Sequence, residues 1–357
     1  MKILSTRYSN APYYIISGWK DVFERLGHEW LWWPHSGSSW LGTDKENRPA
    51  FDVFDEFEPD IFIGDTNIDR ATAKCIAKRP NMKVVLKGRN WGSSDEQIEK
   101  YKIDTDAHPI EVASSEEKNR IRNLKELCGK PDFVFNWYHE KRMPETMGDW
   151  QIIGVDTLDM QPAANHFVYF PVDSSPRLES DISFIGGFWK YKGININKYL
   201  VPLCLPIGKY NIKIFGNQAW AVPQYIGSPS DSIINDILCS AKICPNISGP
   251  HANAFGFEVN ERVFKIAATK SFCISDHIDS LTKDVFTDNE MPTAKDPEEF
   301  FKLIDYYLKE PDLRKEKAEQ CYNTVMGSHT YCHRVSKLLS KLNLPDESNR
   351  AMQLLEK

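Results

Sequence analysis

Residues 257–276 read FEVNERVFKIAATKSFCISD, and this stretch decides the fold. It opens with polar and charged residues, continues as a helical pattern with small residues at 264–269, and closes as an apolar strand at 271–276 that ends in an acid. A helix that begins at such a loop presents unpaired backbone N–H groups there. Doubly wound α/β folds bind phosphorylated ligands at helix starts of this kind. We therefore expect a phosphate-binding site at this point.

Length and composition limit the classes of protein to be considered. The chain has 357 residues, 41% of them hydrophobic, which suffices for two domains that each bury a core. A formal net charge of −6 argues against general attraction to nucleic acid but leaves room for a local basic groove. The 8 cysteines include no Cys-x-x-Cys pair, so we expect reduced core thiols and no disulfide framework or metal knuckle.

Targeting and membrane signals are not apparent in the sequence. The first residues, MKILSTRYSN, read as the start of a buried strand and lack a signal-peptide pattern. No apolar run approaches the roughly 20 residues that cross a bilayer. The expected location is the cytoplasm of the producing cell or of its host.

Strand and helix patterns alternate along both halves of the chain. In the first half we expect strands at 2–5, 28–33, 59–64, 83–87, 132–137 and 150–155, and helices at 14–26 and 71–78. In the second half we expect strands at 181–185, 211–215, 242–247 and 272–275, and helices at 194–203, 230–240, 297–309 and 311–325. This alternation predicts βαβ units and parallel sheets. The stretch 165–180, which has Pro, Ser and charge without periodicity, is the predicted linker.

Three motifs resemble those of a known family. DISFIGGFWKYKG at 181–193 is similar to the first strand and glycine turn in the C-terminal domain of GT-B glycosyltransferases. NERVFKIAATKSFCISD at 260–276 is similar to their Arg-x-Phe-Glu segment, although Lys265 replaces the Glu and Lys270 replaces a Gly. The tail at 296–339 resembles their closing helices and their His-Thr-Tyr-x-x-Arg signature, with His329, Thr330, Tyr331 and Arg334. The nearest group is the spore-maturation type, and the N-terminal half matches by architecture alone.

The resemblance implies a fold, a domain plan and an activity. The fold is α/β, with two Rossmann-like doubly wound domains that face each other across a cleft. The domains are expected at 1–168 for the acceptor and 178–328 for the nucleotide sugar, and a C-terminal helix at 329–357 crosses back to the first domain. The activity is transfer of a hexosyl or pentosyl group from a nucleotide sugar, a UDP- or GDP-sugar, to an acceptor hydroxyl. His329, Tyr331 and Arg334 then have structural roles.

The donor site is expected around the opening segment. Arg262 is the leading diphosphate ligand, because its forked guanidinium matches phosphate oxygens; the alternative is a salt bridge to Glu258 or Asp276. Lys265, three residues later on the same helix face, would add a second charge or be an ordinary solvated lysine. Glu258 and Glu261 would accept hydrogen bonds from ribose or sugar hydroxyls, or cap the helix. The other expected donor contacts are Gly186, Gly187, Gly216, Asn217, His251 and Asn260.

Catalytic and acceptor residues are expected where strands of the first half end. Asp65 is the candidate base for an inverting reaction, and helix capping by Asp65 or Asn67 is the alternative. His139 is the second catalytic candidate. The expected acceptor contacts are Tyr8, Ser9, Arg89, Asn90 and Trp91. No tightly bound cofactor or metal is expected to be required, since the Asp-x-Asp letters at 104–106 lie in a polar, poorly patterned stretch.

The sequence leaves the acceptor and two alternative functions open. A glycan is the acceptor that the resemblance implies. A hydroxylated DNA base is the alternative, because 87–91, 139–142 and 188–192 mix cations with aromatic residues. A sugar-nucleotide epimerase or phosphorylase of the same fold is a second function, and a non-catalytic binding module, suggested by Lys265, is a third.

Overall fold

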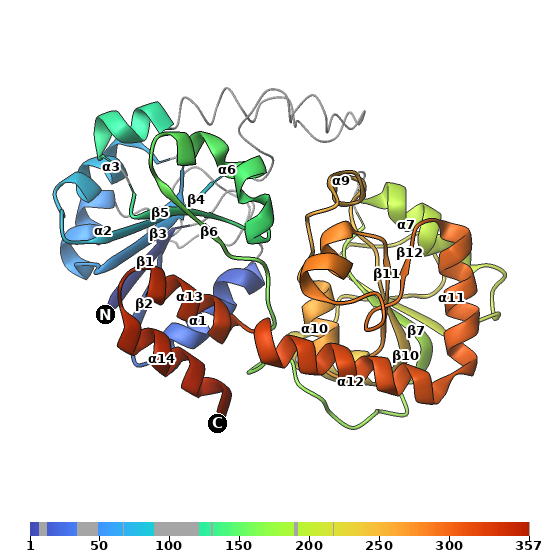
Figure 1. Cartoon of the computed structure of the whole chain (residues 1–357). Coiled ribbons are helices and arrows are strands. Elements are labelled where there is room, and N and C mark those ends of the chain that lie inside the picture. Colours follow the sequence, from blue (N-terminus) through green and yellow to red (C-terminus); the bar gives the residue numbers. More distant parts are fainter. Residues whose placement is uncertain are drawn as a thin grey trace. The chain divides into compact units, whose positions relative to one another are not determined.

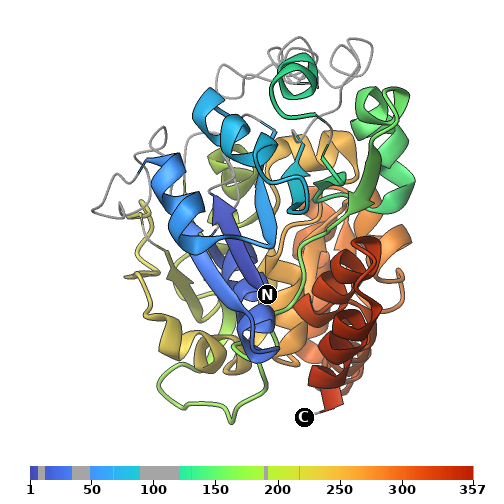
Figure 2. The ribbon, with the colours of Figure 1, turned by 90° about the vertical axis from the view of Figure 1, so that its left-hand side faces the viewer.

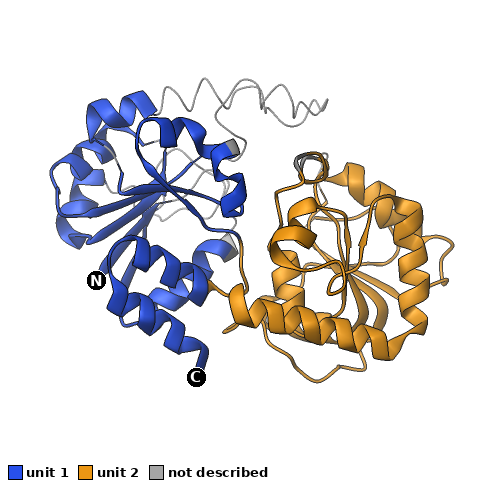
Figure 3. Ribbon diagram, in the orientation of Figure 1, with its two compact units in different colours: residues 1–102, 109–161, 332–357 blue, residues 103–108, 162–331 orange. Residues whose placement is uncertain are grey.

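The computed structural model describes residues 1–6, 13–33, 49–66, 68–88, 121–129, 131–188, 192–216 and 218–356, without the side chains of residues 13, 14, 145, 251 and 255. These residues form two compact units, each built on a parallel six-stranded sheet (Figures 1 and 3). The first unit combines the described residues of 1–161 with the C-terminal 332–357. The second unit spans 162–331 and includes the whole stretch 165–180 that was expected to be a linker.

The first sheet has the strand order β2-β1-β3-β4-β5-β6. Its strands are β1 (Lys2–Thr6), β2 (Glu29–Trp33), β3 (Ile61–Asp65), β4 (Lys83–Lys87), β5 (Phe133–Asn136) and β6 (Asp156–Asp159). Its helices include α1 (Tyr13–Arg25), α2 (Ala50–Phe57), α3 (Arg70–Ala77) and α6 (Met143–Ile152). The central strands are nearly continuous apolar runs because the sheet is buried on both faces.

The second sheet has the strand order β12-β11-β10-β7-β8-β9. Its strands are β7 (Ser180–Ile185), β8 (Ile212–Phe215), β9 (Tyr225–Gly227), β10 (Ala241–Asn246), β11 (Cys273–Asp276) and β12 (Thr293–Ala294). The chain runs outward from β7 through β8 to β9 and then returns to β10 on the other side of β7. The boundary between β7 and β10 is therefore the topological switch point, where open parallel sheets form a crevice at their carboxyl ends.

Helices cover both faces of the second sheet. They are α7 (Gly193–Tyr199), α8 (Ile234–Cys239), α9 (Pro250–Phe255), α10 (Arg262–Ala268), α11 (Pro297–Lys309) and α12 (Pro311–Ser328). Because successive strand residues point to opposite faces, Ile243 and Ile274 join a core with α7 and α11. Their neighbours Cys244 and Cys273 join a second core with α10. All 8 cysteines are free of disulfides.

The C-terminal helices α13 (Tyr331–Lys341) and α14 (Pro345–Gln353), dark red in Figures 1 and 2, pack on the first unit. The Nε of Arg334, which is 8% exposed, donates to the carbonyl oxygen of Gln161 at 2.8 Å. Lys337 pairs with Asp159 at the end of β6, and Lys341 pairs with Asp156 at its start. The C-terminal segment thus returns to the N-terminal part of the chain, as the resemblance implies.

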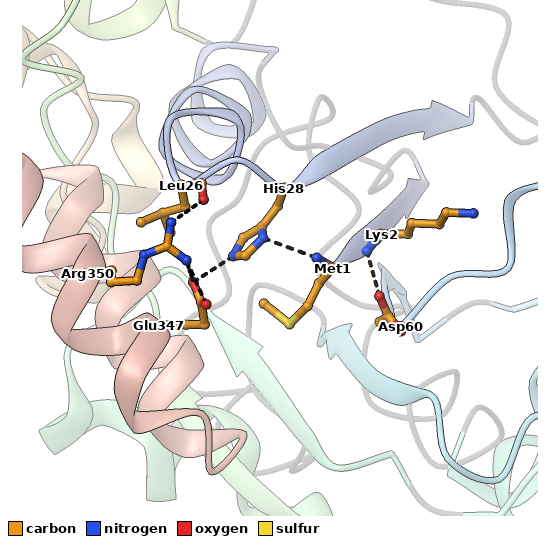
Figure 4. Close-up of polar contacts among 7 residues, drawn as sticks. All are labelled: Met1, Lys2, Leu26, His28, Asp60, Glu347 and Arg350. Carbon is orange, nitrogen blue, oxygen red and sulfur yellow. Dashed lines mark hydrogen bonds and ion pairs between the residues drawn. The ribbon is translucent and has the colours of Figure 1, made fainter.

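A polar cluster joins α14 to the first strands of the same unit (Figure 4). His28 Nε2 lies 2.9 Å from Glu347 Oε2, and His28 Nδ1 lies 3.2 Å from the amino group of Met1. Arg350 donates to the carbonyl oxygen of Leu26 at 2.6 Å and to both carboxylate oxygens of Glu347 at 2.8 Å. Burial, and then the ammonium of Met1, lower the pKa of His28, although Glu347 acts in the opposite direction.

The expected α/β fold class is confirmed, and one expected strand is wrong. Residues 150–155 end α6 and form the turn after it, and the strand follows at β6. A short apolar run fits the periodicity of a strand or of a helix equally well. Here it is helical, because Trp150 is buried and Ile152 is 82% exposed, whereas a strand would place both on one face. The helix expected at 194–203 ends at Tyr199, and a separate 3₁₀ turn contains Pro202. Among the described helices, none combines the length and the apolar composition that a membrane span requires.

The lowered pKa of His28 predicts a pH dependence of stability. The unfolded chain binds the proton of His28 first as pH falls, because the pKa is lower in the folded state. The contribution of His28 to stability is therefore complete above about pH 6.5 and declines below it. In urea titrations from about pH 7.5 to about pH 5.5, the free energy of unfolding should fall less steeply in His28→Gln than in the wild type. Equal slopes would contradict this assignment.

Candidate functional site

Arg262, the first residue of α10, joins the carboxyl ends of β7 and β10. Its Nε donates to the carbonyl oxygen of Ile185 at 3.0 Å, and Ile185 is the last residue of β7. Its Nη1 donates to Asn246 Oδ1 at 3.1 Å and to the carbonyl oxygen of Ile247 at 3.3 Å, at the end of β10. Its guanidinium carbon lies 4.8 Å from the ring centre of Phe184. The switch point of the second sheet therefore has a fixed cation at its centre.

Two glycines keep the strand ends beside this arginine free of side chains. Gly186 follows β7, and a Cβ placed on it would lie 2.8 Å from Nη2 of Arg262. Gly216 follows β8, and a Cβ placed on it would lie 2.2 Å from the carbonyl oxygen of Gly186. Both positions require glycine because backbone and guanidinium approach closely there. Gly187 follows directly and is half-buried.

Lys192, immediately before α7, is a buried basic side chain that was not predicted from the sequence as a site residue. It is 7% exposed, and its Nζ lies 5.9 Å from the centre of the Phe184 ring on which Arg262 also lies. Burial, and then repulsion by Arg262, hold the pKa of Lys192 well below its usual value, although Glu261 and Asp276 raise it. A bound anion would favour the charged lysine. The sequence signal was the Lys-Gly that ends the glycine-turn motif at 181–193.

The polar entry to α10 is held by internal contacts. Asn260 Oδ1 accepts the backbone N–H of Arg262 at 3.2 Å, which fixes the first turn. Glu261 pairs with Lys265 at 2.7 Å, and their side chains are 13% and 18% exposed. Although burial lowers the pKa of Lys265, Glu261 and Tyr169 raise it more, so the lysine stays charged. Lys265 is therefore in an ion pair and is not an ordinary solvated helix lysine.

The first unit contains the two catalytic candidates. Asp65 is the last residue of β3, and His139 precedes the 3₁₀ turn Glu140–Arg142, where its Nδ1 accepts the N–H of Lys141 at 3.3 Å. The alternative role for Asp65, capping the next helix, is wrong, and Asn67, the other capping candidate, lies outside the described residues. Asp69 caps α3, because its carboxylate accepts from Thr72 N at 2.8 Å and from Thr72 Oγ1 at 2.9 Å.

The structure brings together a large part of the predicted donor set at one end of the second sheet, namely Gly186, Gly216, Asn260, Glu261, Arg262 and Lys265. Glu258 lies half-buried in the loop before α10. Six predicted contacts lie outside the described residues, namely Tyr8, Ser9, Arg89, Asn90, Trp91 and Asn217. His251 lies in α9, and its side chain is also outside the described part of the chain. Within that described part, no three His, Cys, Asp or Glu side chains are placed to hold a metal ion.

Comparisons with known proteins show which folds this chain resembles. A glycosyl transferase-like family model matches residues 202–340, whereas comparison with curated protein sequences gives no match. Sucrose-phosphate synthase from Thermosynechococcus elongatus is similar over 96% of this chain and 98% of its own, with 10% identity and a TM-score of 0.66. A glycosyltransferase from Rickettsia africae is similar over 95% and 97%, with 13% identity and a TM-score of 0.62.

A third solved structure with this fold is an α-glucosyltransferase in complex with UDP-glucose and DNA containing an abasic site. It is similar over 96% of this chain and 98% of its own, with 12% identity and a TM-score of 0.61. Structural similarity at such low sequence identity shows the fold alone. The chain has the GT-B fold, and the expected resemblance to glycosyltransferases is confirmed.

The contact between the two glycines predicts an asymmetric response to alanine. Gly216→Ala should lower the free energy of unfolding by ~1–3 kcal/mol, because the new methyl group overlaps the Gly186 carbonyl. Gly327, in α12, has no atom within 4 Å of an added Cβ, so Gly327→Ala should raise it by ~0.5–1 kcal/mol. Denaturant titration of both variants checks this, and a Gly216→Ala protein as stable as wild type would refute the close contact.

Proposed function

We propose that this GT-B chain is a glycosyltransferase that moves a sugar from a nucleotide sugar to an acceptor hydroxyl. The observation that carries the proposal is the meeting of two basic side chains, Arg262 and Lys192, over Phe184 at the switch point of the second sheet. The glycosyl transferase-like pattern at 202–340, which contains Arg262, supports the same activity.

The proposed chemistry follows from where charge develops. As the bond between the sugar and the diphosphate breaks, negative charge grows on the leaving diphosphate. Arg262 would donate to its oxygens in a fixed orientation, because three protein acceptors already hold the guanidinium. Lys192 would supply the second positive charge from a site where water competes little. Two fixed cations can stabilise this charge, so we propose that no divalent metal is required.

The proposed donor is a UDP- or GDP-sugar, with its diphosphate beside Gly186 and Gly216. Neither position can carry a side chain, because Arg262 fills that space at Gly186 and the carbonyl oxygen of Gly186 fills it at Gly216. The two turns are therefore packed closely around the guanidinium that would bind the diphosphate. Asp65 remains the proposed base and His139 its alternative. The proposed location is the cytoplasm of the producing cell or host, in keeping with free cysteines.

Lys192 provides a test in which stability and binding change in opposite directions. Lys192→Met should raise the free energy of unfolding by ~0.5–2 kcal/mol, because a buried ammonium is replaced by an apolar side chain of similar length. The same variant should bind UDP at least about tenfold more weakly, as measured by isothermal titration. Stronger or unchanged UDP binding by Lys192→Met would refute its role in the donor site.

Arg262→Ala tests the other cation. UDP, GDP or their sugars should raise the melting temperature of the wild type by mass action, and Arg262→Ala should lose this shift. Arg177→Ala is the matched control, since Arg177 is an exposed arginine of the same unit. Unchanged nucleotide affinity in Arg262→Ala would overturn the donor-site assignment. If the protein isomerises the nucleotide sugar in the absence of an acceptor, it is an epimerase. If it binds the nucleotide sugar but transfers the sugar to no acceptor, it is a binding module.

The acceptor is proposed to be a glycan hydroxyl, with a hydroxylated DNA base as the second candidate. Two observations favour the second candidate enough to test it. An α-glucosyltransferase of the same fold was solved with DNA, and Lys141 and Arg142 follow the catalytic candidate His139. Glucose transfer from UDP-glucose to a duplex with hydroxymethylated bases, and DNA binding that weakens steeply with salt, would support DNA. No DNA association at low salt would exclude it.

A further inference from the structure

Asp276, the last residue of β11, has a buried carboxylate that the proposed chemistry does not use. The residue is 0% exposed. Its oxygens accept the backbone N–H of Ser248 at 3.1 and 3.0 Å, the hydroxyl of Ser248 at 3.0 Å, and Nδ2 of Asn253 at 3.0 Å. The hydroxyl of Ser275 adds a longer contact at 3.3 Å. Burial raises the pKa of Asp276, and these donors oppose the rise. Each of these partners donates a hydrogen bond, so the site fits a carboxylate, both of whose oxygens accept.

Ser248, which Asp276 holds, is linked to the first turns of two helices. Its carbonyl oxygen accepts Nδ2 of Asn195 at 3.0 Å, and its Oγ accepts Nδ2 of Asn260 at 3.4 Å. Asn195 belongs to α7, and its backbone N–H donates to the carbonyl oxygen of Lys192 at 3.1 Å. Asn260 in turn accepts the backbone N–H of Arg262. One arm thus runs from Ser248 to Lys192 and the other runs from Ser248 to Arg262.

We propose that Asp276 is a positioning residue of the donor site, which sets the separation of Lys192 and Arg262 by fixing Ser248 between their helices. The inference rests on the proposed function for the identity of the anion, a diphosphate. Its two phosphoryl groups have a fixed spacing, so two cations that must contact them together need a fixed spacing as well. Misplacement of either helix start would weaken binding without removing a cation.

A packing role alone does not account for a carboxylate at this place. Burying a charge is unfavourable, and an apolar residue would fill the same volume at lower cost. Asparagine would turn its NH₂ group toward a donor, either Ser248 or Asn253. Asp276 also acts electrostatically on Lys192, together with Glu261 and against Arg262. Loss of its charge should lower the pKa of Lys192 further, so a smaller fraction of Lys192 is protonated at a given pH.

Asp276→Asn is the direct test, with UDP as the probe and isothermal titration across pH as the measurement. UDP binding should weaken at least about tenfold, and its midpoint of loss with rising pH should move to lower pH, because Lys192 deprotonates earlier. Asp279→Asn is the matched control: it removes a carboxylate that is 45% exposed and pairs with Lys283, so both quantities should stay unchanged. Wild-type affinity and pH midpoint in Asp276→Asn would overturn the proposal.

A second readout covers an unstable variant and a failed donor assignment. If Asp276→Asn does not fold, Asn195→Ala removes the arm to α7. It should weaken UDP binding at least about tenfold and leave the pH midpoint in place, because the charge of Asp276 remains. If the wild type binds neither UDP nor pyrophosphate, the proposed function fails by itself. Hydrogen exchange then decides the positioning role. Asp276→Asn should accelerate exchange in the first turns of both α7 and α10. Asn195→Ala, used in its place, should accelerate exchange in the first turn of α7. Faster exchange confined to α9 and β11 would overturn the inference.

Discussion

The guanidinium of Arg262 is the contact on which the ligand end of the second unit depends. It donates to the last carbonyl of β7 and to the side chain of Asn246 at the end of β10, across the place where the strand order reverses. One guanidinium thereby connects the carboxyl ends of β7 and β10, the neighbouring strands from which the chain continues in opposite directions across the sheet. The glycine turns follow from the same requirement, because a side chain at Gly186 would meet this guanidinium. Fold and proposed chemistry therefore share one residue.

The first unit is organised by a different constraint, the return of the C-terminal helices. Lys337 and Lys341 pair with the two ends of β6, an edge strand. The side chain of Asp159 is largely covered there, and that of Asp156 stays exposed. Arg334, expected from the tail motif to be structural, donates to the backbone of Gln161. Within the tail signature, Arg334 thus has a packing contact in this unit, whereas His329, Thr330 and Tyr331 belong to the second unit. Charged side chains that recur in a motif need not belong to a site.

The fold could be predicted from the sequence because buried parallel strands have short, continuous apolar sequences, as in KVVLK and DFVFNW. The same rule failed at 150–155, where an equally apolar run ends a helix, with Trp150 buried and Ile152 exposed although both would share one face of a strand. In the candidate site, Arg262 was predicted from the chemistry of its guanidinium and from the family resemblance. Lys192 was not, because a lysine in a sequence gives no sign of its burial, and neither was the contact of Asp276 with Ser248, 28 residues away in the chain. Such contacts arise from tertiary packing and leave no local pattern.

The most direct measurement of the central claim is a crystal structure of the wild-type chain with UDP. The diphosphate should lie at the switch point of the second sheet, with its oxygens within hydrogen-bonding distance of both Arg262 and Lys192 and next to the backbone of Gly186. A diphosphate bound elsewhere, with Arg262 and Lys192 in contact only with protein groups, would contradict the account.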